Sequence, residues 1–341
     1  MSFAPYRVGM SGSSTLLGKE ILSVLKERQF PLTHVSALAE EPPDPQSPVL
    51  DISGEAVPVL EESEPGEAEC DFVFLADAAE GRDIPHRKQW CFVIDARQGP
   101  GTSEEAVLWT SPLESDAGSL TSAARAGASV FAAPHPAAIT VGSLLLRLSA
   151  SLEIQRVSAT IFNPASAIGP AAIEELQKQT VGLLNFGEVP HEVFGAESAF
   201  NLLPRLTGNA QELFAGTESR IRKDVERILA GRAPLPALQM LQTPVFYSTA
   251  CSIYLQASPA VGAIQVEQSL GSEGIRWIPA SAPPSAPADI QGSPLFFMDP
   301  VRADPSHPGG FWLCTRVDDL RLAAESAVAI AERLVPFIVR S

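Results

Sequence analysis

The side chains best suited to chemistry lie in two segments that are far apart in the sequence. Cys251 follows Thr249 by two residues within VFYSTACSIYL (245–255), so in a strand both side chains would lie on one face. His135 lies within VFAAPHPAAIT (130–140). An ionised thiol can act as a nucleophile, and an imidazole can titrate near neutral pH. Because neither has a catalytic partner nearby in sequence, we expect Cys251 to be a small core residue and His135 to be structural or exposed.

The N-terminal turn could bind an anion. A strand over 6–9 leads into this turn, and a helix is predicted over 16–28 from its apolar periodicity. Such a turn places N–H groups and hydroxyls at a helix N-terminus. Thr15, however, lies between Gly12 and Gly18, where a β-branched side chain would obstruct the approach of a pyrophosphate. The candidate cofactor residues, which form a weak nucleotide site, are Gly12, Ser13, Ser14, Thr15 and Leu16.

Alternating elements predict the fold that must position these residues. Further strands over 35–38, 72–76 and 92–96 indicate a Rossmann-like, doubly wound parallel sheet in an α/β protein. We expect this domain to span 1–133. An α+β domain is expected over 134–318. Its predicted elements are strands over 157–162, 245–255 and 311–317, and helices over 170–184, 218–229 and 259–270, with a final helix over 319–335. Prolines predict loops at 40–47 and 280–288, and the acidic stretch 61–71 is expected to be a solvated surface.

Composition excludes several kinds of partner. The 341 residues include 24 Lys and Arg against 40 Asp and Glu, a net charge of −16, which argues against binding to nucleic acid or an anionic membrane. The sequence has no apolar run of membrane-spanning length and no signal-peptide pattern. Four scattered cysteines fit reduced thiols rather than disulfides or a zinc site. We therefore expect a cytoplasmic protein without a metal.

Several segments resemble aspartate-semialdehyde dehydrogenases, and in particular their USG-1-like branch. They are SGSSTLLGKEIL (11–22), AFNLLPRL (199–206) and TPVFYSTACS (243–252), with a less specific match in the last helix (317–334). Their order and spacing extend the resemblance over nearly the whole chain. It implies that the last helix returns to the first domain, so that an NAD(P)-binding-type domain spans 1–133 plus about 319–341. It also implies a semialdehyde dehydrogenase-like dimerisation domain over 134–318 and a homodimer.

The resemblance also places the family's functional groups on this sequence. Its nucleophilic Cys, the Gln near the thioester and the acid/base His correspond to Pro136, Asn163 and Thr249. Its substrate-binding Glu, phosphate-binding Lys and substrate-binding Arg correspond to Thr217, Arg220 and Gln242. A proline cannot attack a carbonyl, and a threonine cannot act as a base near neutral pH. The family's chemistry is therefore expected to be absent.

The cofactor positions are changed too. Ser36-Ala37-Leu38 has no cation for a 2′-phosphate, and Ser326-Ala327-Val328-Ala329 lacks the polar groups that the resemblance implies near a nicotinamide. Nucleotide binding stays open, with NAD favoured over NADP.

Three functions remain on this basis. The leading one is a non-catalytic binding or structural homodimer. The alternative is an NAD(P)-dependent oxidoreductase acting on an aldehyde or semialdehyde in amino-acid biosynthesis, with Cys251 as nucleophile or with direct hydride transfer. The third is a sensor of a small metabolite that uses Arg220 and Asn163 as anchors.

Overall fold

The computed structural model describes residues 5–37, 49–52, 55–61, 70–77, 91–99, 106–110 and 118–338. The chain forms two compact units, Met1–Pro134 with Ala323–Ser341 and His135–Leu322. The expected loop at 40–47 and residues 62–69 of the acidic stretch lie outside the described residues.

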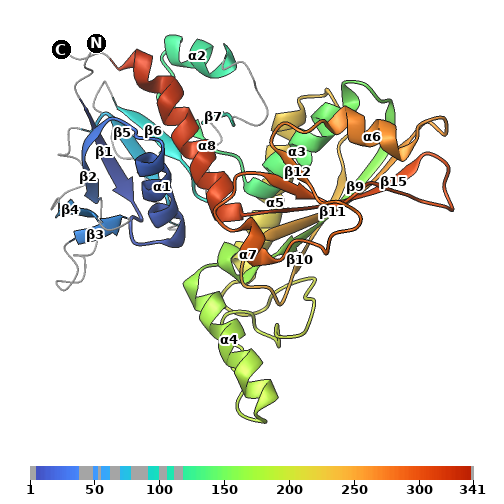
Figure 1. Cartoon of the computed structure of the whole chain (residues 1–341). Coiled ribbons are helices and arrows are strands. Elements are labelled where there is room, and N and C mark those ends of the chain that lie inside the picture. Colours follow the sequence, from blue (N-terminus) through green and yellow to red (C-terminus); the bar gives the residue numbers. More distant parts are fainter. Residues whose placement is uncertain are drawn as a thin grey trace. The chain divides into compact units, whose positions relative to one another are not determined.

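The first unit is built on a largely parallel sheet (Figure 1). Its strand order in the described residues is β3-β4-β2-β1-β5-β6-β8-β7, and β3 alone runs antiparallel to its neighbour there. The order β4-β2-β1-β5-β6-β8 is that of a doubly wound fold, which confirms the predicted fold class. The strands are β1 (Tyr6–Ser11), β2 (Leu32–Ala37), β3 (Val49–Ile52), β4 (Glu55–Glu61), β5 (Phe72–Leu75), β6 (Phe92–Asp95), β7 (Val107–Leu108) and β8 (Val130–Ala132).

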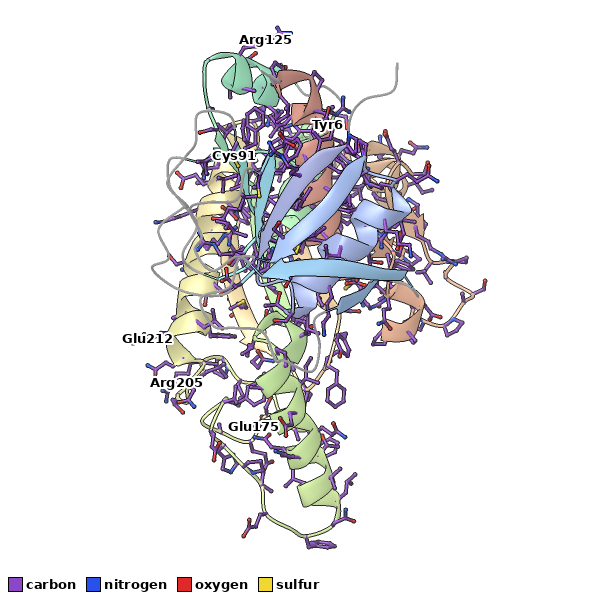
Figure 2. All side chains as sticks on the ribbon, turned by 90° about the vertical axis from the view of Figure 1, so that its left-hand side faces the viewer. Tyr6, Cys91, Arg125, Glu175, Arg205 and Glu212 are labelled. Carbon is purple, nitrogen blue, oxygen red and sulfur yellow. The ribbon has the colours of Figure 1, made fainter. Side chains whose placement is uncertain are left out.

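Buried apolar runs explain this sheet. All four residues of β5 are buried, as expected for a parallel strand covered on both faces. Figure 2 shows Tyr6 and Cys91 at the same edge of the sheet, where β1 and β6 begin. Helices α1 (Leu16–Glu27), α2 (Gly118–Arg125) and the part of α8 (Asp319–Leu334) from residue 323 belong to this unit. Arg28 at the end of α1 forms ion pairs with Glu325 and Glu332 of α8.

The second unit contains a mixed sheet. Its order is β10-β9-β11-β15-β13-β12 in the described residues, with β14 paired to β15. The strands β9 and β10 are parallel, whereas β11 is antiparallel to both β9 and β15. The bounds are β9 (Ile154–Asn163), β10 (Ala237–Gln242), β11 (Thr249–Ala257), β12 (Ile275–Trp277), β13 (Phe296–Met298), β14 (Arg302–Ala303) and β15 (Gly310–Val317).

Helices cover one face of this sheet. The apolar helix α3 (Pro136–Ser149) packs against β9 and β11 and against α5 (Gln211–Leu229) and α6 (Ala263–Leu270) (Figure 1). Gly142 allows this close contact, because a Cβ there would lie 2.5 Å from Ile228 Cγ2 of α5. The same unit contains α4 (Pro170–Leu184), on which Figure 2 labels Glu175, and the short α7 (Pro287–Ile290). Short 3-10 turns, Ala165–Ala167 and Val335–Phe337, complete the described helical elements.

Several predicted elements have different bounds. The strand predicted over 245–255 was wrong at its start, because Ser248 adopts φ 76° and β11 begins only at Thr249. The helix predicted over 218–229 begins at Gln211, and that predicted over 259–270 begins at Ala263. Helix α3 and strand β10 were not predicted at all.

Candidate functional site

Three predicted site residues lie in one row at the end of the second unit's sheet. Gln242 of β10 pairs in register with Asn163 of β9, and Thr249 begins the neighbouring strand β11. Because Ala250 pairs with Phe162, Thr249 lies beside Asn163 in the antiparallel register. Asn163, Gln242 and Thr249 are 3%, 0% and 1% exposed. Strand alternation therefore places all three side chains on the helix-covered face.

One hydrogen bond joins the two amides in this row. Asn163 Nδ2 donates to Gln242 Oε1 at 2.9 Å, and Gln242 Nε2 donates to the carbonyl of Thr243 at 3.2 Å. The hydroxyl and N–H of Thr243 donate to the carbonyl of Asn163 at 2.9 and 3.0 Å. The result is a buried, neutral network, in which neither amide carries a charge that could hold a carboxylate.

The β11 end of the row contains a buried hydroxyl and a buried thiol. Thr249 Oγ1 has no hydrogen-bond partner among the described residues. Cys251 lies on the same face and is 2% exposed, and burial raises the pKa of its thiol to about 12. A thiol with that pKa stays protonated near neutral pH and is a poor nucleophile.

Asp319, at the start of α8, holds the turn before β11. Its carboxylate accepts the backbone N–H groups of Ser248 and Thr249. Burial raises the pKa of Asp319 to about 7, with a further contribution from neighbouring Asp318, although the N–H bonds act in the opposite direction. Asp319 could not be identified from the sequence, because its contact with the turn joins segments about 70 residues apart.

The start of α3 forms a second group. Pro136 is the first residue of the helix and is buried, and His135 caps the helix by accepting the N–H of Ala137 on Nδ1 at 3.1 Å. The N–H of His135 donates to Asp224 Oδ2 at 2.8 Å. Burial, together with the positive charge of Arg220, lowers the pKa of His135 to about 3. The imidazole is therefore neutral near pH 7 and serves as a cap.

The helix α5 supplies the ion pair next to this cap. Arg220 Nε lies 3.3 Å from Asp224 Oδ2, and these side chains are 4% and 3% exposed. Thr217, one turn earlier in α5, is 8% exposed. Asp224 was missed in the sequence, although its spacing of four residues from Arg220 is typical of helical ion pairs. The charge of Arg220 is thus balanced by a carboxylate of its own helix.

In the predicted cofactor turn of the first unit, the side chain of Thr15 is held by hydrogen bonds to neighbouring backbone groups. Gly12 has φ 78°, and Thr15 caps α1 by accepting the N–H of Gly18 at 3.0 Å. Thr15 Oγ1 also donates to the carbonyl of Gly12 at 2.7 Å, and the carbonyl of Ala76 lies 3.2 Å from the same hydroxyl. Ser13, Ser14 and Leu16 complete the turn and the first position of the helix. Thr15 thus lies inside the turn, between α1 and the end of β5.

The other cofactor positions are also engaged within the first unit. Ser326 Oγ lies 3.0 Å from Thr110 Oγ1, and both residues are buried. Ala327, Val328 and Ala329 are buried apolar residues of α8. Ser36 is buried, whereas Leu38 lies outside the described residues. Among the predicted cofactor positions that the structure describes, the turn at 11–16 is the one at a helix N-terminus.

Neither a metal-binding cluster nor a membrane-spanning helix occurs among the described residues. Among them, no three or more His, Cys, Asp or Glu side chains are grouped so that they could hold a metal ion. Within the same part of the chain, no helix is long and apolar enough to cross a membrane.

Sequence comparison identifies relatives along almost the entire chain. A USG-1 protein homolog from Pseudomonas aeruginosa is 27% identical, over 97% of this chain and 98% of that protein. An aspartate-semialdehyde dehydrogenase from Rickettsia bellii is 25% identical, over 97% and 98%.

Solved structures share the fold. A probable aspartate-semialdehyde dehydrogenase from Pseudomonas aeruginosa superposes with a TM-score of 0.81 at 24% identity, over 97% of this chain and 98% of that chain. Aspartate semialdehyde dehydrogenase II from Vibrio cholerae, complexed with ASA, gives 0.80 at 23% identity, over 97% and 98%. The family model described as semialdehyde dehydrogenase, dimerisation domain, matches residues 145–322, more than half of the chain. The chain therefore belongs to the semialdehyde dehydrogenase family.

Proposed function

We propose that this protein is a non-catalytic, homodimeric member of the family that serves as a binding or structural protein. The proposal rests mainly on the buried, hydrogen-bonded Asn163–Gln242 pair. At the positions where the resemblance implies a Gln and a substrate-binding Arg, two neutral amides bond to each other and are sealed from solvent. A charged, bidentate contact with a carboxylate has no counterpart in this pair.

The other positions that could be reactive also support a non-catalytic protein. Pro136 offers neither a nucleophile nor an N–H, and Thr249 offers no titratable base. Cys251 is buried on the face that α3 covers, with its thiol protonated, so it does not replace the missing thiolate. His135 has its Nδ1 engaged in the cap of α3.

A homodimer is supported by the family match and by the open face of the sheet. The outer face is defined as the side of β9, β11 and β15 that carries Phe162, Ser252, Tyr254, Trp312 and Cys314. Trp312 is 40% exposed, and its ring centroid lies 4.9 Å from that of Tyr254. An aromatic pair on a broad sheet is a suitable centre for an interface.

A turnover assay tests the catalytic part. The purified protein is incubated with aspartate semialdehyde, phosphate and NAD or NADP, with the Vibrio cholerae enzyme as positive control. We expect no nucleotide reduction above the rate without protein. Turnover that a thiol-alkylating reagent abolishes would contradict the proposal.

Sedimentation tests the dimer. We expect the mass of two chains for the wild type and a shift toward one chain for Trp312→Arg, which places a charge on the outer face. Ile264→Arg is the matched control, because Ile264 is 69% exposed on α6, a helix that packs against α3. A monomeric wild type would rule out the homodimer.

The second candidate is an NAD(P)-dependent oxidoreductase acting on an aldehyde or semialdehyde by altered chemistry. It is favoured by the doubly wound sheet and by the turn at its β1 end, where such folds bind dinucleotides. Calorimetry with NAD and NADP tests it, since this candidate requires binding at millimolar nucleotide or below.

A further inference from the structure

We propose that an acidic arm of each chain lies on the aromatic pair and the arginines of the partner's outer face in the homodimer. The arm is defined as residues 170–199, which are α4 and the segment that follows it. The inference deepens the proposed function and rests on the homodimer proposed there. It concerns the second unit alone and uses none of the positions discussed for catalysis.

The sheet of the second unit is basic in a chain that is acidic overall. Its seven strands, β9 to β15, contain four arginines and no acidic residue, whereas the chain has a net charge of −16. Two of the arginines, Arg156 and Arg302, are exposed and form no ion pair with any described residue. They are therefore available to the carboxylates of a partner.

Both of these arginines lie beside the aromatic pair of the outer face. Arg302 is directly opposite Trp312 in the β14–β15 ladder, and Arg156 is opposite Gln256, two residues after Tyr254 in β11. Because opposite residues of a ladder share a face, the two cations and the two rings form one patch. This patch lies toward the start of β9.

The aspartates in the loop around β14 have partners of their own. Asp299 Oδ2 lies 2.6 Å from Nη2 of Arg316, a third arginine of the sheet. Asp304 accepts the N–H of Ser306 at 2.9 Å, and its other oxygen lies 2.9 Å from His307 Nδ1. Neither aspartate is paired with the arginines of the patch.

The arm is acidic, and its own side chains hold it together. Residues 170–199 contain five glutamates, one lysine and no arginine. One glutamate, Glu175, is buried and accepts the N–H groups of 193–194 at 2.7 and 3.0 Å. Gln179 accepts those of 198–199 at 2.7 and 3.0 Å. A surface that is ordered in this way before binding loses little entropy when a partner docks.

The tip of the arm carries apolar side chains that the fold of the single chain does not bury. Val181, Leu184 and Phe186 are exposed, and the exposed fraction of Phe186 is 99%. Phe186 has φ 54° and directly follows the C-cap of α4, where glycine is usual because a Cβ is strained in this conformation. A strained and fully exposed phenylalanine contributes no packing within the chain, and such apolar surface is typical of protein contacts.

The direction of β9 explains why the arm meets a second copy. The arm follows the end of β9 at Asn163 and extends away from the sheet (Figure 1), whereas Arg156 lies near the start of the same strand. A two-fold axis perpendicular to the strands reverses their direction between the two copies. It therefore brings the arm of each chain to the patch of the other, so that glutamates face arginines and the apolar tip faces the aromatic pair.

The test is the dissociation constant of the full-length dimer, measured by sedimentation equilibrium. One variant reverses the charge of two exposed glutamates of the arm, Glu192→Arg with Glu197→Arg. A second variant reverses the patch, Arg156→Glu with Arg302→Glu. A third variant combines all four substitutions and so restores opposite charges across the contact.

We expect each reversed variant to dimerise at least about tenfold more weakly than the wild type, because like charges then meet in both copies of the contact. The combined variant should return to within about threefold of the wild type. Glu212→Arg with Glu226→Arg is the control, because it makes the same reversal at exposed positions of α5, and it should dimerise like the wild type.

Two glycine substitutions test the apolar tip. Phe186→Gly should weaken the dimer at least about tenfold, because the exposed ring is lost. Ala230→Gly is the matched control: Ala230 is exposed and has φ 45° at the end of α5, so both substitutions relieve the same strain. Ala230→Gly should therefore leave the dissociation constant unchanged.

The outcomes separate this contact from the homodimer itself. A dimeric wild type whose dissociation constant is unchanged by the charge reversals, or is not restored in the combined variant, would overturn the contact while the homodimer stands. Equal effects of Phe186→Gly and Ala230→Gly would also overturn it. A monomeric wild type would refute the homodimer and the contact together.

Discussion

Asn163 and Gln242 lie 79 residues apart in the sequence, yet their side-chain amides bond at 2.9 Å across the parallel strands β9 and β10. Both side chains are buried, and Gln242 Nε2 donates to the carbonyl of Thr243. Buried polar groups are costly unless they are paired, and these are paired only with groups of the same unit. The network is therefore stable without a ligand.

Breaking the pair should destabilise the protein. We expect Gln242→Met to lower the free energy of unfolding by about 1–3 kcal/mol, because Asn163 Nδ2 loses its main acceptor while it stays buried. Urea unfolding measures the change. The double variant Asn163→Leu, Gln242→Met should cost less than the sum of the two single variants, since it leaves no orphaned amide of the pair.

A control on the same strand separates burial from loss of a hydrogen bond. Gln239 of β10 is exposed and donates to Thr160 Oγ1 at 2.9 Å. Gln239→Met should change stability by less than about 0.5 kcal/mol, as is usual at surfaces. Equal effects at positions 239 and 242 would show that the buried pair has no special role.

Cys251 should resist alkylation in the folded protein. With a pKa of about 12, about one thiol in 10⁵ is ionised at pH 7, and the residue is buried as well. Cys70, which is half-buried just before β5 in the first unit and is not part of the outer face, is the internal control. Timed treatment with iodoacetamide, followed by peptide mass spectrometry, should label Cys70 first and Cys251 only after denaturation. Early labelling of Cys251 would show that its thiol is accessible and reactive in the folded protein, which would make it a candidate nucleophile again.

Local sequence patterns predicted β1, α1, β5 and β6 of the first unit from their apolar runs and helical periodicity, whereas β3, β4, β7, β8 and α2 were not predicted. Residues 72–76 and 92–96 are bounded by polar segments, and the structure places β5 and β6 there to within one residue. The turn at 11–15 was recognised from Gly12 and Gly18, whose packing leaves no room for a Cβ.

Several elements of the second unit could not be predicted, because they depend on contacts that a local sequence pattern does not show. The start of α3 lacks a common capping residue, because His135 provides the cap through Nδ1, and the helix was missed. The start of β11 was missed because Ser248, a non-glycine residue, turns the chain with positive φ. The meeting of Asn163 and Gln242 required the register of β9 and β10, and β10 itself was not predicted.

Ser248 should tolerate glycine. Its φ of 76° is strained for a side chain with a Cβ, and the hydrogen bond to Asp319 uses the backbone N–H, which glycine retains. We expect Ser248→Gly to raise the free energy of unfolding by about 0.5–1 kcal/mol, as relief of strain exceeds the entropy that glycine adds to the unfolded chain.

Ser252→Gly serves as its control. Ser252 lies within β11 in an extended backbone, where glycine has no strain to relieve. There the same change should lower stability by about 0.5–1 kcal/mol. A loss of stability at both positions would show that the turn at Ser248 carries no strain.

Asp319 should make stability depend on pH in a defined direction. Its pKa is about 7 in the folded protein, raised by burial and by Asp318 above the ordinary aspartate value of 3.8. Between these values the folded state binds the proton more strongly than the unfolded state does. The contribution of Asp319 is thus fully present below about pH 4 and is lost as the pH rises through about 7, with a maximum slope of about 1.4 kcal/mol per pH unit.

Asp319→Asn removes this titration and keeps an oxygen that can accept the N–H groups of Ser248 and Thr249. Urea unfolding at a series of pH values should therefore show that the stability of the wild type, relative to the variant, declines from about pH 4 to about pH 7 and is level above that range. Glu188→Gln, at an exposed position, should follow the wild type throughout. Parallel pH profiles of the wild type and Asp319→Asn would mean that the carboxyl is not desolvated, so that the turn before β11 would not be held by a buried Asp319.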